Sequence, residues 1–308
     1  MITISADFHL NAQNRLEDFS YSLEQIAKYA NESSLLILLG DIYHHRKPTP
    51  KEMNVFRDFI NKVKVPIEMI IGNHDQDRED SALDEFSKFN HPNISLRKAP
   101  YILSTHGLSL WLYHGTIEGA QIGPYNMTLG LKEELKVKEL KKLGCDFYLC
   151  GHIHKAQIIT DNIIYPGSIE RVDFGERNEK KYVVQLDETT KKFGFKQLDI
   201  RPMVQMEIEV KTNSGVGIIK TERAPIVKIV FKGTRKELDK FSDTEWRKYL
   251  SEVAYSFQIM YEEIQEERKV SSGINEKVSL DSSFKEYAKI KQLDEVTINR
   301  GLELLSEY

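Results

Sequence analysis

The sequence predicts an α/β fold in which helices cover a central sheet. Short apolar runs alternate with apolar residues at helical spacing through the first half of the chain. Short polar motifs follow several of the apolar runs directly, as ligand sites do at strand ends of α/β sheets. The chain has 308 residues, of which 40% are hydrophobic and 29% charged, a composition typical of soluble globular proteins.

The first half supplies the elements of this sandwich in order. The apolar runs predict strands over 2–6, 35–39, 66–71, 101–103, 108–113, 147–150, 157–160 and 163–165. The two runs around Thr105-His106-Gly107 are expected to form a hairpin. Helical spacing predicts helices over 16–30, 53–63, 82–89 and 131–143, the last ending at Gly144 as its C-cap.

The pattern changes after about Pro202. Strands are expected over 206–210, 226–231 and 257–261, with one helix over 234–255, which together form a small β-α-β unit. A polar segment with glycine and serine follows, and then two short helices within 284–308. The predicted division is therefore 1–200 for the first domain, 201–265 for a second domain, and 266–308 for a linker and C-terminal helices.

Composition excludes several classes of protein. The net charge of −4 gives no bulk signal for nucleic-acid binding, so any polyanion must be held by a local patch or by metals. Cys145 and Cys150 have no second pair to form a zinc pattern, and we expect two reduced, buried thiols. The N-terminus lacks the features of a signal peptide, and the longest apolar run, 35–39, is too short to span a bilayer. The expected location is the cytoplasm, with no membrane partner.

Most of the nine histidines lie in five short motifs beside acids, amides or glycines. Each motif follows or ends a predicted strand, so all five are expected at the carboxyl ends of strands, where α/β sheets bind ligands. Side chains at i and i+2 in extended backbone point the same way, so each Asp-x-His or His-x-His pair can reach one ion. The motifs are Asp7-Phe8-His9, Gly40-Asp41-Ile42-Tyr43-His44, Gly72-Asn73-His74-Asp75, Tyr113-His114-Gly115 and Gly151-His152-Ile153-His154.

The residue types indicate a centre with two metal ions. Asp41 is the best candidate to bridge them, because a carboxylate has two oxygens, and Asn73 offers a neutral amide oxygen. Nitrogen and oxygen ligands without thiolate suit manganese, iron or zinc better than calcium or magnesium. Two such ions stabilise the attacking and leaving oxygens of a displacement at phosphorus. Of the adjacent His44 and His45 we expect only His44 to face the metals, and His91 and His106 are interpreted as ordinary surface residues.

The order of these motifs resembles that of the calcineurin-like metallophosphoesterases. Two further stretches, Gly40 to Pro48 and Tyr165 to Glu176, resemble the DNA double-strand-break repair nuclease of the meiotic recombination eleven or SbcD family. The phosphoprotein phosphatases instead carry Asp-Arg-Gly and Gly-Asn-His-Glu, and this sequence has neither.

The resemblance implies a four-layer metallophosphoesterase sandwich with a small β-α-β capping domain, and a manganese-dependent DNA exo- and endonuclease. Two Mn²⁺ ions are implied, with Mg²⁺, Fe²⁺ or Zn²⁺ as possible substitutes. His74 would contact the scissile phosphate and assist the leaving group, Asp75 could orient its ring, and His44 would support the transition-state charge. Metal one would take Asp7, His9, Asp41 and His154, and metal two would take Asp41, Asn73, His114 and His152.

The resemblance also implies partners. These are DNA, an SMC-like ATPase of the SbcC type, and a second copy of the chain, bound through helices of the first domain. The apolar stripes Met53/Phe56/Ile60/Val63 and Ala82/Leu83/Phe86/Phe89 fit a dimer surface, although such stripes are more often core. Candidate DNA contacts, each equally readable as solvated surface, are Arg46, Lys47, Arg171, Arg177, Lys180 and Lys181.

Three functions remain to be compared. The leading hypothesis is DNA end processing in double-strand-break repair by a two-metal nuclease. The same residues could serve a stand-alone phosphodiesterase that acts on nucleotides or small phosphoesters, against which the second domain and the 165–176 stretch argue. A scaffold that tethers DNA ends without catalysis would not need the complete ligand set that this sequence carries.

Overall fold

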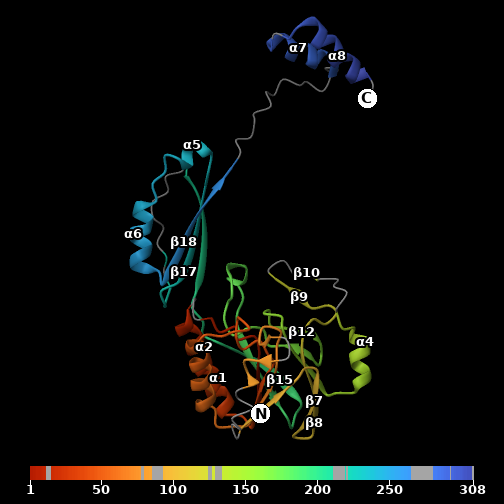
Figure 1. Ribbon diagram of the computed structural model, residues 1–308, viewed down its shortest axis with the longest axis vertical. Helices are drawn as coiled ribbons and strands as arrows, with labels where there is room; N and C mark the ends of the chain where they lie inside the picture. Colours follow the sequence, from red (N-terminus) through yellow and green to blue (C-terminus); the bar gives the residue numbers. More distant parts are fainter. Residues whose placement is uncertain are drawn as a thin grey trace.

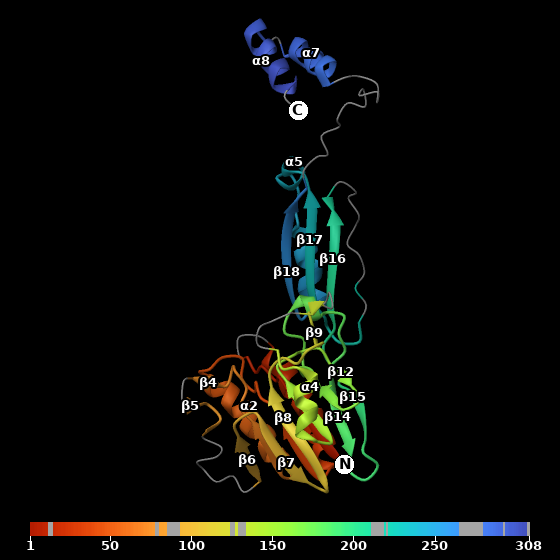
Figure 2. The same ribbon diagram turned by 90° about the vertical axis from the view of Figure 1, so that its right-hand side faces the viewer.

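The computed structural model describes residues 1–11, 15–77, 80–84, 93–123, 127–128, 134–210, 219, 221–264, 280–291 and 293–306. Within these ranges, two large sheets form the first part of the chain, and a three-stranded sheet rises from one end of it (Figure 1, Figure 2). Two two-stranded ribbons accompany them, β4 (Gln76–Asp77) with β5 (Asp80–Ser81) and β9 (Gln121–Ile122) with β10 (Met127–Thr128).

The larger sheet has six strands in the order β15-β14-β1-β2-β3-β6. The strands β1, β2, β3 and β6 run parallel, whereas β14 pairs antiparallel with both β1 and β15. The carboxyl ends of β1, β2 and β3 therefore meet at one edge of the sheet, where ligand sites gather in this class of fold. The bounds are β1 (Ile2–Ser5), β2 (Leu35–Leu38), β3 (Ile67–Ile70), β6 (Ile94–Arg97), β14 (Tyr182–Asp187) and β15 (Lys192–Gln197).

The second sheet has five strands in the order β12-β13-β11-β8-β7. The strands β8, β11 and β13 run parallel, and β7 and β12 pair antiparallel at the two edges. Gly151 pairs with His114 in the register of β11 and β8, so both strands end side by side. The expected hairpin is confirmed as β7–β8. The bounds are β7 (Tyr101–Thr105), β8 (Leu108–His114), β11 (Phe147–Gly151), β12 (Gln157–Thr160) and β13 (Ile163–Tyr165).

The two sheets and their helices form four layers. Side chains of both sheets, among them Ile4, Ile37 and Leu110, make the core between the sheets. The outer face of the six-stranded sheet packs on α1 (Leu16–Asn31) and α2 (Pro50–Lys62). The outer face of the five-stranded sheet packs on α4 (Val137–Leu140) and its 3₁₀ extension (Lys141–Leu143) through Leu140. The predicted four-layer α/β sandwich is confirmed.

Helix α2 shows how the sequence sets an element and its buried face. Thr49 accepts a hydrogen bond from the backbone N–H of Glu52, and the Glu52 carboxylate accepts one from the Thr49 N–H, which is a capping box before Pro50. The stripe that follows packs inward, with Phe56, Ile60 and Val63 at most 4% exposed in the core. The expectation that this stripe forms a dimer surface is therefore wrong, because those side chains are already buried against their own sheet.

The second apolar stripe is only partly visible. Leu83 is buried and Ala82 packs against the same core, whereas Phe86 and Phe89 lie outside the described residues. The helix expected over 131–143 is shorter in its described part, since Leu135 forms a bridge with Ile117 instead of a helical turn. Gly144 ends it with φ of 67°, as its expected C-cap conformation requires.

Three strands of the six-stranded sheet were not expected, namely β6, β14 and β15. A period-two pattern was present in β15, where Phe193 and Phe195 alternate with polar residues or glycine. In β14 the adjacent Val183 and Val184 are both buried, which is typical of a strand covered on two faces.

The third sheet consists of β16 (Met203–Glu209), β17 (Ile226–Gly233) and β18 (Ser256–Glu263), all parallel. One face packs on Trp246 and Leu250 of α6 (Thr244–Val253). The single helix expected over 234–255 is two, because α5 (Arg235–Leu238) ends early and the polar segment Asp239 to Asp243 precedes α6. Serine and aspartate favour caps and turns over helix interiors.

At the C-terminal end, α7 (Leu280–Ile290) and α8 (Glu295–Ser306) contact one another, as two helices were expected there (Figure 1). Cys145 and Cys150 are free and buried, which confirms the expected pair of reduced thiols. Among the helices that the structure describes, none combines the length and apolar composition needed to cross a membrane.

Candidate metal centre

The predicted site residues converge at the ends of strands from both large sheets. Asp7 and His9 follow β1, Asp41 follows β2, and Asn73 and His74 follow β3. From the other sheet, His114 ends β8, and His152 and His154 follow β11. Nitrogen and oxygen atoms of the site form three groups, and each group could hold one cation. The groups are Asp7 with His9 and His154, Asp41 with His114 and His152, and His9 with His44 and His74.

The backbone of these loops is bent into conformations that side chains seldom adopt. Left-handed φ values occur at Asp7 (52°), His9 (46°), Asp41 (52°) and His152 (92°). Such conformations cost on the order of 1–3 kcal/mol each and persist where the surrounding structure enforces them. Here they turn side chains of the strand ends toward one another.

Glycines allow the ends of β2 and β3 to touch. A Cβ at Gly72 would lie 2.2 Å from both the backbone nitrogen and the Oδ1 of Asp41. A Cβ at Gly40, where φ is 86°, would lie 2.7 Å from Gly72 and from Nδ1 of His114. The Gly-Asp and Gly-Asn motifs therefore combine a ligand with the small residue that permits its close approach.

The first group joins Asp7, His9 and His154. Nε2 of His9 lies 2.9 Å from Nε2 of His154. The Asp7 carboxylate accepts the His152 backbone N–H at 2.8 and 3.1 Å, which fixes its direction. Burial raises the pKa of Asp7 to about 6, so at neutral pH this side chain is still the anion that a cation requires.

The second group surrounds Asp41. Oδ2 of Asp41 lies 3.1 Å from Nε2 of His114 and 3.7 Å from Nε2 of His9, so this oxygen stands between the two groups. Oδ1 of Asn73 lies 3.0 Å from Nε2 of His114 and from Nδ1 of His152. The other oxygen of Asp41 accepts the His74 backbone N–H at 2.8 Å, which holds the carboxylate in place.

Electrostatics in this group favour positive charge. Burial acts to lower the pKa of His114, but its hydrogen bond with Asp41 and the charge of that carboxylate outweigh burial and raise it to about 9. Burial opposes ionisation of Asp41 as well, yet His114 and His9 hold the pKa of this carboxyl below its usual range. Burial lowers the pKa values of His9 and His152, which keeps neutral nitrogen lone pairs available.

The residues fit a pair of divalent metal ions. Nδ1 of His9 is buried and has no hydrogen-bond partner within the described chain, and Nε2 of the same ring faces another imidazole nitrogen. Several lone pairs of nitrogen and carboxylate oxygen face one another here without enough protons to form hydrogen bonds between them. A bound cation would accept these lone pairs. The donor set of imidazole, carboxylate and amide oxygen suits manganese, iron or zinc.

The outward nitrogens of two ligand rings are held by neighbouring groups. Nδ1 of His114 donates to the Leu39 carbonyl oxygen at 2.7 Å, and Nδ1 of His154 donates to Oε1 of Glu176 at 2.8 Å. Such partners fix the tautomer and orientation of a metal-binding imidazole. Glu176 was not assigned a role from the sequence, although it ends the 165–176 stretch.

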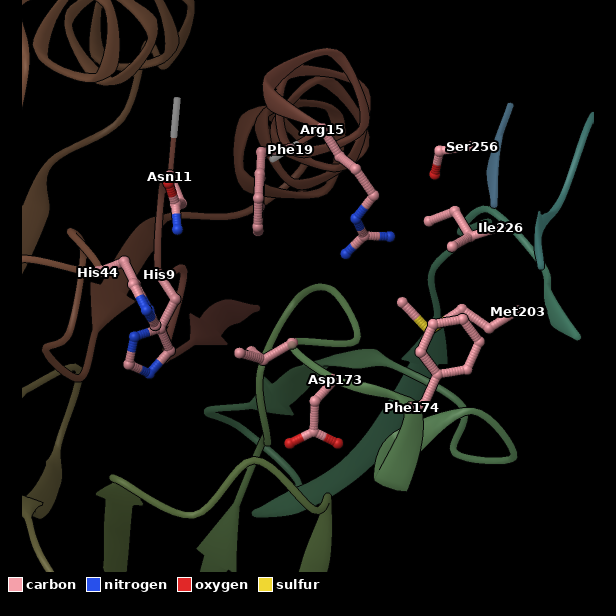
Figure 3. Close-up of a pocket in the computed structure, with 11 residues that line it drawn as sticks. His9, Asn11, Arg15, Phe19, His44, Asp173, Phe174, Met203, Ile226 and Ser256 are labelled. Atoms are coloured by element: carbon pink, nitrogen blue, oxygen red, sulfur yellow. The ribbon is translucent and has the colours of Figure 1, made fainter. Parts of the chain in front are cut away.

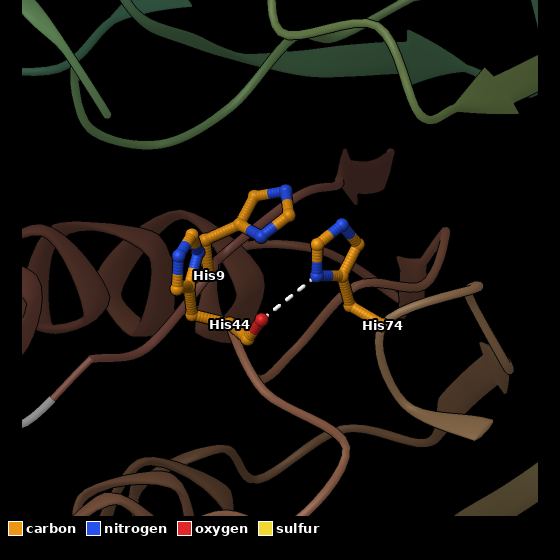
Figure 4. Close-up of side chains that lie close together, drawn as sticks. All are labelled: His9, His44 and His74. Carbon is orange, nitrogen blue, oxygen red and sulfur yellow. Dashed lines mark hydrogen bonds between the residues drawn. The ribbon is translucent and has the colours of Figure 1, made fainter. Parts of the chain in front are cut away.

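The third group consists of His9, His44 and His74, whose rings lie close together (Figure 4). Nδ1 of His74 donates to the His44 carbonyl oxygen at 2.7 Å, the dashed line in Figure 4, so Nε2 is the nitrogen that takes no part in this hydrogen bond. The His44 ring lies 5.5 Å from that of His9 and stacks at 5.8 Å on that of His74. His44 belongs to this group, whereas the adjacent His45 is exposed.

Asp75 has a different place from the one expected. Its carboxylate is fully buried and accepts backbone N–H groups of Ile42 and Tyr43 at 2.9 and 3.0 Å and of Gly72 at 3.1 Å. The carbonyl of His44, and not Asp75, orients the His74 ring. Asp75 therefore ties the loop after β2 to the loop after β3, because its oxygens are turned into the backbone.

Two of the six basic residues considered for DNA contact form hydrogen bonds within the protein instead. Lys181 is 1% exposed and donates to Oε2 of Glu176 at 2.5 Å and to the hydroxyl of Ser168 at 2.8 Å. Arg171 donates to the backbone carbonyls of Glu179 and Arg201. Both are therefore structural, which corrects the expectation for them.

The remaining candidates are more accessible. Arg46, Lys47 and Lys180 are exposed, and Arg177 is half-buried with a hydrogen bond to the Phe174 carbonyl. His106 is exposed in the β7–β8 turn, and His91 lies outside the described residues.

Comparison with known proteins gives one family and several relatives. A model of the calcineurin-like phosphoesterase superfamily domain matches residues 1–191. The DNA double-strand break repair protein Mre11 of Archaeoglobus fulgidus is 23% identical over an alignment 354 residues long, gaps included. The alignment covers 94% of this chain and 79% of that protein. The SbcD component of the nuclease SbcCD from Staphylococcus epidermidis is 22% identical over 268 residues, covering 67% and 71% of the two chains.

Among solved structures, the Pseudomonas putida nuclease MPE is 16% identical, with a TM-score of 0.37, over 59% of this chain and 83% of that one. A TM-score this low adds nothing to the assignment, which depends on the family match together with the sheet topology.

Proposed function

The chain belongs to the calcineurin-like phosphoesterase superfamily, a group of metal-dependent phosphoesterases, and on this premise we propose that it is a manganese-dependent DNA nuclease. The observation that carries the proposal is the convergence of two groups of nitrogen and oxygen donors on the single carboxylate of Asp41. The names of the two curated relatives, a double-strand break repair protein and a nuclease component, support DNA as the substrate and end processing as the task.

Each group of donors would hold one Mn²⁺ ion. Metal one would be held by Asp7, His9, Asp41 and His154, and metal two by Asp41, Asn73, His114 and His152. When bound, two divalent cations supply positive charge that neutralises phosphoryl oxygens and lowers the pKa of water. The protein fixes the donors beforehand through backbone bends at Asp7, Asp41 and His152 and through the partners of His114 and His154.

His74 and His44 act on the substrate in this proposal. Since Nδ1 of His74 donates to a backbone carbonyl, Nε2 is the nitrogen left for the substrate, and the imidazolium form of the ring can give its Nε2 proton to the leaving oxygen of the cleaved phosphodiester. The half-buried His44 ring stacks beside it and can donate a hydrogen bond to a phosphoryl oxygen. Asp75 contributes by holding the loops that carry both residues.

The proposal extends to partners on the strength of the family resemblance. We infer that the chain works with an SMC-like ATPase of the SbcC type, as a homodimer in the cytoplasm. Because the α2 stripe is buried in the core, a dimer must use other surfaces of the first-domain helices. Sedimentation of the purified chain alone and with an ATPase partner measures both associations.

A nuclease assay tests the function. The purified chain is given DNA with defined ends in Mn²⁺, Mg²⁺ or Zn²⁺, with and without an ATPase partner, and bis(p-nitrophenyl) phosphate in parallel. We expect cleavage of DNA that is highest in Mn²⁺. Turnover of the small phosphodiester with no cleavage of DNA under any condition would instead identify a stand-alone phosphodiesterase.

A further inference from the structure

A cavity of about 210 Å³ opens beside the candidate metal centre (Figure 3). That volume is several times the ~30 Å³ that one water occupies in the liquid. Two members of the third group, His9 and His44, line one side of it. A molecule bound at the metal centre can therefore extend directly into this cavity.

The opposite walls are apolar and come from three separate parts of the chain. Phe19 of α1 and Phe174 of the 165–176 stretch are two of them, and Met203 and Ile226 of the third sheet are the others. The register explains the sheet residues: Val227 faces α6, so Ile226 points to the uncovered face, together with its partners Met203 and Ser256. Two aromatic rings and two apolar chains suit a flat, uncharged ligand.

Arg15 is one of the polar residues that line the cavity, together with Asn11 and Asp173. Its backbone is left-handed, with φ of 50°, and its guanidinium points into the cavity in Figure 3. Nη2 donates to the Arg171 carbonyl at 2.5 Å, whereas the buried Nη1 has no hydrogen-bond partner in the described chain. The charge of Arg15 is already matched by Asp18 and Glu170, at 3.8 and 3.6 Å from Nη1.

This pairing determines which ligand chemistry fits. A guanidinium flanked by two carboxylates attracts a further anion weakly. An uncharged planar heterocycle is therefore favoured over a phosphate beside this guanidinium. The same heterocycle can stack on Phe174.

We propose that this cavity receives the base of the nucleotide next to the cleaved phosphodiester, with Phe174 as the stacking wall. The inference rests on the proposed nuclease function and adds a specificity-determining subsite to it. Stacking of one base on an aromatic side chain is expected to be worth about 10- to 100-fold in binding. The enzyme therefore recognises an unstacked base as well as the backbone.

The first test compares strands that differ by one base. Single-stranded oligonucleotides carry an abasic residue at each position in turn around the cleaved bond, and kcat/KM is measured in Mn²⁺. One position is expected to lose about 10-fold or more. Phe174→Ala should bring the intact-to-abasic ratio at that position close to 1, Phe174→Tyr should keep it, and Asn178→Ala, an exposed neighbour in the same segment, serves as the matched control.

Other outcomes separate the two proposals. Equal cleavage of intact and abasic strands by the unaltered protein overturns the subsite and leaves the nuclease in place. A Phe174→Ala variant that loses activity on both strands equally also overturns it, since that pattern means a disturbed loop. No cleavage of any strand, with metal bound, overturns the nuclease.

A second measurement does not depend on turnover. An oligonucleotide with 2-aminopurine at the same position is titrated with the unaltered chain without metal. Quenching of 2-aminopurine fluorescence that disappears in Phe174→Ala and persists in Phe174→Tyr supports base stacking in the cavity. Quenching of the same size in all three proteins overturns it.

Discussion

Nε2 of His74 is the atom best placed to move a proton in the proposed reaction. His74→Ala should lower kcat for DNA cleavage by about 10²- to 10⁴-fold, the usual contribution of a positioned acid or base. Metal content should stay unchanged, because His74 belongs to neither proposed ligand set. Kinetics and elemental analysis of the same preparation measure both quantities.

The control for this variant is His106→Asn. His106 is exposed in the β7–β8 turn with φ of 49°, a conformation that asparagine tolerates. Its cleavage rate should match that of the unaltered protein. Nuclease activity that persisted in His74→Ala would refute the role given to this ring.

Asp41→Ala should remove both metal ions, because Oδ2 stands between the two groups of donors. Metal stoichiometry after dialysis is the measurement, with Asp161→Ala, an exposed aspartate in the β12–β13 turn, as the control. A crystal of Asp41→Ala with two fully occupied metal positions would contradict the bridging assignment.

The raised pKa of His114 predicts how metal binding depends on pH. Without metal the pKa is about 9, so below pH 9 the ring holds a proton that a cation must displace. Affinity for Mn²⁺ should therefore rise about tenfold per pH unit from pH 7 to 9 and then level off. Calorimetry in buffers of different ionisation enthalpy measures the released proton, and an affinity independent of pH over this range would show that His114 is not a ligand.

At this scale the sequence identified the clustered residues but not their supports. Asp7, Asp41 and the histidines were visible because each sits in a short motif at a strand end. Glu176 and Lys181 were missed in their actual roles, because a carboxylate or lysine that acts through buried contacts has no local spacing to distinguish it from surface. Asp75 was misplaced for a related reason, since its partners are backbone N–H groups, which carry no sequence signal.

Among the elements, the contact between the ends of β2 and β3 is the tightest. Gly72→Ala should lower the free energy of unfolding by about 1–3 kcal/mol and weaken metal binding, because a Cβ would lie 2.2 Å from Asp41. Thermal unfolding and metal titration measure the two effects.

Gly194→Ala in β15 is the matched control for that change. A Cβ there meets nothing within 4 Å, so the free energy of unfolding should change by less than about 0.5 kcal/mol. Equal effects of the two substitutions would show that backbone propensity, and not the close approach of Gly72 to Asp41, is responsible.

Periodicity predicted the elements that pack on one face and failed where other forces decide. Helices α1 and α2 were found because their apolar stripes face the core, and α2 also has its capping box. The helix over 234–255 was wrong in length, since the apolar spacing continues through Phe241 while Asp239 and Asp243 favour a turn. Strand β6 was missed because the alternation of Ile94 to Arg97 covers only four residues, and β14 because the adjacent Val183 and Val184 interrupt alternation.

Over the whole molecule, one buried carboxylate joins the sandwich to the segment that leads into the third sheet. Asp18 of α1 is 1% exposed and accepts Nε of Arg201 at 2.9 and 2.8 Å and Nη2 of Arg223 at 3.2 Å. The guanidinium of Arg201 also lies 3.8 Å from the ring centroid of Tyr255, next to β18. These contacts hold the third sheet beside the metal centre.

Asp18→Ala should lower the free energy of unfolding by about 3–5 kcal/mol, because it leaves the buried Arg201 without its carboxylate partner. Chemical denaturation measures this loss. Glu24 lies on α1, as Asp18 does, and forms an exposed ion pair with Lys62 of α2. Glu24→Ala should change the free energy of unfolding by less than about 1 kcal/mol. A loss of similar size in both variants would mean that Asp18 does not connect the two parts of the molecule.

The burial of Asp18 has a consequence for behaviour in salt. Mobile ions screen exposed charges within about 10 Å at 0.1 M but reach a buried pair far less. The affinity of a protein for nucleic acid, by contrast, falls steeply as ionic strength rises. Concentrated salt should therefore dissociate a bound polyanion, while the α/β sandwich and the third sheet keep their relative orientation.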